Sequence, residues 1–159
     1  MKNFIFEKVQ SVFDVGGVKI GGQPGVNPTV LIGSMFHKGD KLIEDRKTGS
    51  FDKGAARQRL KRLEEISQKT GIPAMVDIVA NSADEFSRYI EFVVTETGAP
   101  VCIDAWQPRV RIEAARCAAR SGLLERLIYN SLNPWNKDLE AEVNEIAEIG
   151  VRHVVVCVF

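Results

Sequence analysis

The sequence is poor in the residue types that build disulfide frameworks and metal sites. It has only three cysteines, Cys102, Cys117 and Cys157, and they are widely spaced with no C-x-x-C pair. An odd number of cysteines at this spacing argues against a disulfide framework and against a closed zinc knuckle. We therefore expect three free thiols and no bound metal.

The sequence also lacks a long apolar run and an excess of charge of one sign. No stretch approaches the roughly 18 apolar residues of a membrane-spanning helix, and the opening MKNFIFEKVQ does not have the pattern of a secretory signal. These absences predict a cytoplasmic protein with no direct membrane insertion. Lys plus Arg and Asp plus Glu both number 21, with the signs interspersed, which does not favour a nucleic-acid partner.

The 159 residues are 45% hydrophobic, enough for one domain with a core. A β-hairpin is predicted near the amino terminus, because residues 12–15 and 18–20 flank Gly16-Gly17, a pair that suits a tight turn. We expect a single domain over residues 1–159, with the hairpin and a loop in 1–28 and strand-helix units in 29–159.

Strands and helices are predicted to alternate from residue 29. Apolar runs predict strands at 29–36, 74–79, 101–105, 127–131 and 153–159, the first of them buried on both faces. Helices are predicted to begin at Asp52, Ser82, Pro108 and Asn133-Pro134. In the last helix, the inward stripe is expected to be Leu139, Val143, Ile146 and Ala147. The charged stretch 37–51 is long for a loop and is interpreted as a lid or docking loop.

This alternation calls for a parallel sheet with right-handed crossovers. A doubly wound open sheet would satisfy it, but no G-x-G-x-x-G follows the first parallel strand. A TIM (β/α)8 barrel has eight units over about 250 residues, and this chain supplies about four and a half. The predicted fold class is α/β, the amino-terminal half of a TIM barrel preceded by a β-hairpin.

Polar residues stand at the ends of three predicted strands. Asp77, Asp104 and Asn130 close the second, third and fourth parallel strands, and Ser131 and Asn133 follow closely. Ligands of parallel α/β proteins bind at the carboxyl ends of the strands. Each residue alone could be a turn former, but three in register predict a site. Carboxylates and amides there suit a planar heterocycle with alternating donors and acceptors, and an acid could protonate a ring nitrogen.

Three segments, MVDIVANS, VCIDAWQPRVRIEAARCA and LIYNSLN, resemble the pterin-binding barrel family. The stretch VFDVGGVKIGGQPGVNPTVLIGSMFHKGDKLIEDRKTGSFDK is similar to the H-subunit family of tetrahydromethanopterin S-methyltransferase and to bacterial relatives acting on methyltetrahydrofolate. The resemblance implies methyl transfer between N5 of a reduced pterin, tetrahydromethanopterin or tetrahydrofolate, and the cobalt of a corrinoid on a separate protein. It makes Asp77 and Asp104 catalytic, and Asp77, Asp104, Asn130, Ser131 and Asn133 pterin-binding.

The same resemblance implies two partners: a corrinoid protein, and a larger methyltransferase complex to which the chain belongs as a peripheral component. The predicted half-barrel adds a homodimer, because two copies could close a ring and hide both sheet edges. Two alternatives stay open. The chain could be a non-catalytic fragment or half-barrel interaction subunit of that family. It could also be a dihydropteroate-synthase-like pterin enzyme, although VANSADEF is a poor match to the glycine- and serine-rich loop of that enzyme.

Overall fold

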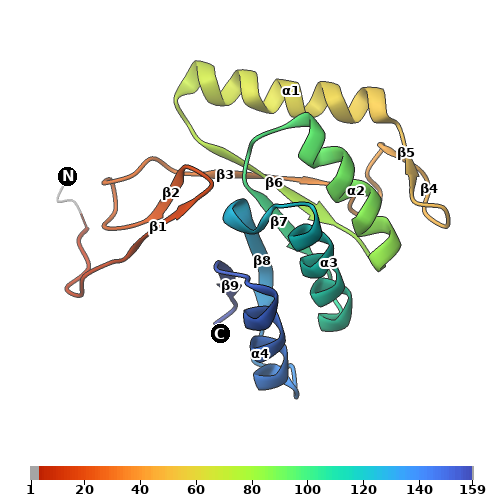
Figure 1. Cartoon of the computed structure of the whole chain (residues 1–159). Coiled ribbons are helices and arrows are strands. Elements are labelled where there is room, and N and C mark those ends of the chain that lie inside the picture. The colour runs from red at the N-terminus through yellow and green to blue at the C-terminus, as the bar shows by residue number, and fades with distance from the viewer. Residues whose placement is uncertain (1–3, 159) are drawn as a thin grey trace.

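The computed structural model describes residues 4–158, which form a five-stranded parallel sheet flanked by helices (Figure 1). The strands lie side by side in chain order: β3 (Leu31–Met35), β6 (Ala74–Val79), β7 (Val101–Asp104), β8 (Leu127–Leu132) and β9 (Val154–Val156). A doubly wound sheet reverses its strand order at a switch point, whereas a barrel wall does not. The sequential order therefore confirms the predicted partial α/β barrel.

Four helices follow the strands: α1 (Lys53–Thr70), α2 (Ala83–Glu96), α3 (Pro108–Arg120) and α4 (Leu139–Ile149), with a short 3₁₀ helix η1 (Leu124–Arg126) before β8. The predicted caps are confirmed for the first two. The Asp52 carboxylate accepts a hydrogen bond from the N–H of Ala55 at 2.9 Å, and the Ser82 hydroxyl accepts one from the N–H of Glu85 at 3.3 Å. Such caps satisfy amide groups that have no partner inside the helix.

The main core lies between the sheet and these helices. Alternate residues of the central strands, among them Val76, Ile78 and Ile103, point into it and meet apolar residues of α2 such as Phe86 and Ile90. All are fully buried. Because successive strand residues point to opposite faces, the neighbouring residues of these strands face the other side, which is the concave side of the curved sheet in Figure 1.

A hairpin covers the amino-terminal end of that concave side. Its strands β1 (Val12–Val15) and β2 (Val18–Gly21) pair antiparallel, and Gly16 and Gly17 both have positive φ, as predicted for the turn. Val15 packs with Met75, Cys102 and Ile128 of the central strands in a small second cluster. The hairpin thus covers the half-barrel where its strands begin and leaves uncovered the side where they end.

Two strand predictions were wrong in extent or burial. The strand predicted at 29–36 to be buried on both faces is half exposed along β3, with Leu31 47% and Ile32 55% exposed. The strand predicted at 153–159 is only three residues long, all of them exposed, and its last predicted residue lies outside the described part of the chain. Both are edge strands of the sheet, so only one neighbouring strand covers each.

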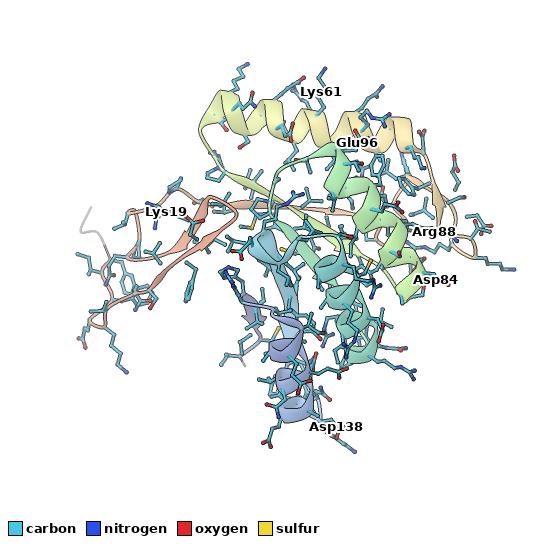
Figure 2. All side chains as sticks on the ribbon, in the orientation of Figure 1. Lys19, Lys61, Asp84, Arg88, Glu96 and Asp138 are labelled. Atoms are coloured by element: carbon cyan, nitrogen blue, oxygen red, sulfur yellow. The ribbon has the colours of Figure 1, made fainter. Side chains whose placement is uncertain are left out.

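The stretch predicted as a long loop at 37–51 contains a second small hairpin, β4 (Ile43–Asp45) with β5 (Ser50–Phe51). Asp40 at its base pairs with Arg59 of α1 at 2.9 Å. On the other side, Figure 2 shows Arg88 of α2 beside this hairpin, where its guanidinium donates to the backbone carbonyl of Thr48. These contacts tie the segment to the two helices.

The last helix was also misplaced. It begins at Leu139 rather than at Asn133-Pro134, because residues 133–138 form a turn in which the Asn136 side chain accepts from the N–H of Asp138 at 3.1 Å. Val143 and Ala147, predicted to face inward, are exposed, and Glu142 is buried instead. Across residues 4–158, no helix combines the length and apolar character that crossing a bilayer requires.

Candidate functional site

Four polar side chains from adjacent strands meet on the concave face at the carboxyl end of the sheet. The register pairs Ser34 of β3 with Asp77 of β6, and Asp104 of β7 with Asn130 of β8. The Ser34 hydroxyl donates to Asp77 Oδ2 at 2.8 Å, and Asn130 Nδ2 lies 3.5 Å from Asp77 Oδ1. The structure therefore brings together the three strand-end residues predicted from the sequence.

The two carboxyl groups are held in a poorly hydrated place. Burial raises the pKa of Asp77, against the opposing effect of its hydrogen bonds from Ser34 and Asn130. Burial also raises the pKa of Asp104, the negative charge of Asp77 raises it further, and Arg111 acts in the opposite direction. Such shifts favour the protonated form of a carboxyl group at higher pH than usual, as a general acid requires.

A cavity of about 800 Å³ opens beside these groups. Four of the five predicted site residues line it: Asp104, Asn130, Ser131 and Asn133. Asp77 is not on its wall and lies behind Asn130, to which it is hydrogen-bonded. The volume falls in the range of small-molecule sites. Two smaller hollows of about 570 Å³ lie away from the carboxylates, one between the hairpin and α1 and one between β5 and α2.

Two tryptophans stand on the loops around this cavity. Trp106, directly after β7, is 92% exposed, and Trp135, after β8, is 67% exposed. The backbone N–H of Trp135 donates to Asn133 Oδ1 at 3.2 Å, so the predicted Asn133 side chain shapes its own loop. Ser131 Oγ lies 3.2 Å from Cys157 Sγ on the neighbouring chain segment. The cavity wall is thus polar at its base and aromatic at its mouth.

Two features of the site escaped the sequence analysis. Ser34 could have been found, since it is a polar residue near the end of the first parallel strand and is in register with Asp77. The second feature is a buried ion pair between Arg111 of α3 and Glu142 of α4 at 2.8 Å. The two residues are 31 positions apart in the sequence. They lie on helices predicted from their apolar stripes, and no sequence pattern indicates that the two charged residues pair.

The arrangement suits a flat polar heterocycle better than a metal ion. Across residues 4–158, no three His, Cys, Asp or Glu side chains come together as metal ligands would. Carboxylates accept hydrogen bonds from ring N–H groups, and the amide of Asn130 offers both a donor and an acceptor. An exposed indole face at the mouth can stack on a flat ring.

Comparison with known proteins gives a consistent result. The family described as tetrahydromethanopterin S-methyltransferase MtrH subunit matches residues 8–159. The chain is 44% identical over 139 residues to the H subunit of tetrahydromethanopterin S-methyltransferase from Methanothermobacter thermautotrophicus, covering 87% of this chain and 45% of the relative. It is 39% identical over 152 residues to the H subunit of the same enzyme from Methanopyrus kandleri, covering 96% of this chain and 47% of the relative.

A third relative, the H subunit of the putative methyltransferase mtx from Methanosarcina mazei, is 39% identical over 146 residues, which cover 92% of this chain and 47% of that protein. The chain therefore spans about half the length of the curated relatives it matches. On the extent of the family match and the level of identity, the chain belongs to the MtrH family of tetrahydromethanopterin S-methyltransferase subunits.

Proposed function

We propose that the chain supplies the pterin-binding part of a methyltransferase that moves a methyl group between N5 of a reduced pterin and the cobalt of a corrinoid carried by a separate protein. The observation that carries this proposal is the cluster of Asp77, Asp104 and Asn130 beside the cavity at the strand ends. The names of the relatives refer to tetrahydromethanopterin and so support it as the pterin that binds here. Tetrahydrofolate is the other candidate.

The proposed roles follow from the chemistry of each group. Asp104 and Asn130 hold the pterin ring from the cavity wall, with Ser131 and Asn133 as further contacts. Asp77 acts from behind by fixing the amide of Asn130. A protonated Asp104 donates its proton to a pterin nitrogen, which makes that nitrogen a better leaving group for the methyl transfer. The raised pKa of Asp104 supports this role.

The partners and the location belong to the same proposal. The methyl acceptor is a corrinoid protein, and the chain acts in the cytoplasm as a peripheral component of a larger methyltransferase complex. A homodimer is proposed because the two edge strands of the sheet expose apolar side chains, including Leu31 and Ile32 on β3 and Val154 to Val156 on β9. The same exposure favours the second candidate, a half-barrel interaction subunit without its own catalysis.

Titration calorimetry with methyltetrahydromethanopterin and methyltetrahydrofolate tests the site directly. Saturable binding is expected for the wild type, and Asp104→Ala should weaken it by about ten- to a hundredfold, since hydrogen bonds to charged groups contribute about 1.5–3 kcal/mol. Asp84→Ala is the matched control, because Asp84 is an exposed residue of α2 (Figure 2). Wild-type affinity in a folded Asp104→Ala variant would contradict the assignment.

A further inference from the structure

We propose that Arg111 is a positioning residue of this site: its buried guanidinium fixes the two loops that carry Trp106 and Trp135 at the mouth of the cavity. The link to pterin rests on the proposed function, whereas the effect on the loops does not. Arg111 is only 2% exposed and Glu142, its partner, 3%. Solvent therefore screens this ion pair much less than it screens an exposed one.

The first loop is held through its backbone. Arg111 Nη1 donates to the carbonyl of Ala105 at 2.5 Å and to that of Trp106 at 3.2 Å. These two residues directly follow Asp104 on β7. A side chain that binds two successive carbonyls fixes the course of the chain at the point where it leaves the strand.

The second loop is held through Glu142. One oxygen of this carboxylate accepts from Arg111 Nη2 at 2.8 Å and from the Tyr129 hydroxyl at 2.5 Å. The other accepts from Asn136 Nδ2 at 2.5 Å. Tyr129 precedes Asn130 on β8, and Asn136 follows Trp135. The network therefore connects the loop after β7, the strand β8 and the loop after β8 through one ion pair.

The composition of this network favours a positioning role over a purely stabilising one. Removing two charges from water is costly, so a buried ion pair is weak evidence for stability and is retained in some proteins to specify one arrangement. Within residues 4–158, the Nε of Arg111 has no hydrogen-bond partner, so the pair is not optimally satisfied. The contacts of its other atoms lead to segments that border the cavity.

The molecule offers an internal comparison. Arg116, also on α3, pairs with Glu145 of α4 at 2.5 Å, but both side chains are 41% exposed and the ion pairs of Arg116 lead only to α3 and α4. It joins the same two helices as the Arg111 pair does. An effect that arises from helix docking alone should appear on loss of either pair, whereas an effect on the loops should follow only from loss of the buried one.

Fluorine NMR measures the loops without ligand. The chain has two tryptophans, so labelling with 5-fluorotryptophan gives one signal for each loop. In Arg111→Met/Glu142→Leu, which leaves neither charge buried alone, both signals should narrow, because loops that have lost these hydrogen bonds reorient faster. Line width is the readout because both indoles are already largely exposed. In Arg116→Met both line widths should stay unchanged. Arg111→Lys keeps the charge but cannot reach the same set of acceptors, and it should give an intermediate change.

Calorimetric titration of the same samples with the reduced pterin measures whether the loops affect binding. The double variant is expected to bind at least about tenfold more weakly than the wild type, and Arg116→Met with wild-type affinity. Unchanged fluorine signals in a folded double variant, or a lowered unfolding midpoint as its only change, would overturn the proposal. Glu142→Gln, which keeps the side-chain shape, gives the same test if the double variant does not fold. Absence of binding by the wild type contradicts the proposed function and leaves the fluorine result valid.

Discussion

Asp104 has a carboxyl group whose pKa differs from that of a free aspartate, and this couples the site to the stability of the fold. Burial and the charge of Asp77 raise its pKa above the usual 3.8. For an acid with a raised folded-state pKa, its contribution to stability is fully present below the unfolded-state pKa and is lost as pH rises through the folded one. Ionisation of Asp104 in the folded protein is therefore destabilising.

We expect Asp104→Asn to raise the free energy of unfolding at pH 7 and to leave it nearly unchanged at about pH 3.5, where the wild-type carboxyl is protonated. Urea denaturation at several pH values measures this difference. Glu96→Gln is the control, and it should lower the free energy of unfolding at pH 7 instead of raising it. The reason is that the hydrogen bond from Arg57 lowers the pKa of Glu96. A gain in stability that is constant over the whole pH range would argue against a titrating Asp104.

The three cysteines are free, as the sequence predicted, but they differ in access. Burial, aided by the charges of Asp77 and Asp104, raises the pKa of Cys102 to about 12. Cys117 is also buried, whereas Cys157 is partly exposed and lines the cavity. Because the thiolate is the reactive form and needs access, iodoacetamide should label Cys157 at least about tenfold faster than the other two. Peptide mass spectrometry of the native protein gives the three rates, and preferential labelling of Cys102 would contradict the burial of its thiol.

Among single residues, those fixed by strand register could be predicted and those fixed by long-range pairing could not. Asp77, Asp104 and Asn130 were found because alternation places them on one face of the sheet, although Asp77 lies one row below the paired Asp104 and Asn130. Arg111 and Glu142 were missed because each becomes favourable to bury only in the presence of the other. A sequence pattern read along one helix contains no information about that partner.

At the scale of elements, local signals predicted the start of α1 and α2, and tertiary contacts overrode them in α4. Asp52 and Ser82 act on amides within three residues of themselves, so the sequence alone predicts them. The inward stripe of α4 was wrong at Val143 because Glu142 turns toward Arg111 and Tyr129. β3 was wrong in burial because an apolar run resembles a central strand even where it forms an edge.

The turn of the amino-terminal hairpin gives a test at this scale. Gly16 and Gly17 both have positive φ, but a Cβ on Gly16 would lie 2.5 Å from the Cβ of Arg126, and one on Gly17 meets nothing within 4 Å. Alanine at either position should cost about 1–2 kcal/mol for the left-handed backbone. Gly16→Ala should cost roughly 1–3 kcal/mol more, because the hairpin must move away from the chain segment before β8.

Chemical denaturation of the two glycine variants measures these costs, and the Gly17→Ala variant supplies the backbone contribution alone. Equal losses in both variants would mean that the hairpin does not pack against Arg126 in solution. A larger loss for Gly16→Ala would support the role of this hairpin in closing the amino-terminal end of the sheet, where Val15 meets Met75, Cys102 and Ile128.

For the whole molecule, the proposed homodimer follows from the two edges of the sheet. β3 and β9 run parallel to their neighbours, and both expose apolar residues. A twofold axis along the barrel direction would place β9 of one copy beside β3 of the other and would cover both edges at once. Unpaired, apolar edge strands otherwise tend to associate without order.

Light scattering should accordingly give twice the chain mass of 17.6 kDa. Val155→Lys should give the monomer, because Val155 is paired in register with Asn130 and faces the same concave side, which the second copy would bury. Val143→Lys is the matched control: Val143 is 40% exposed and Val155 38%, but Val143 lies on the helix α4 and not on an edge strand. A monomeric wild type, or equal dissociation of the two variants, would contradict pairing through β9. Dimerisation lost only in Val155→Lys, together with pterin affinity, would mean that the second copy completes the site.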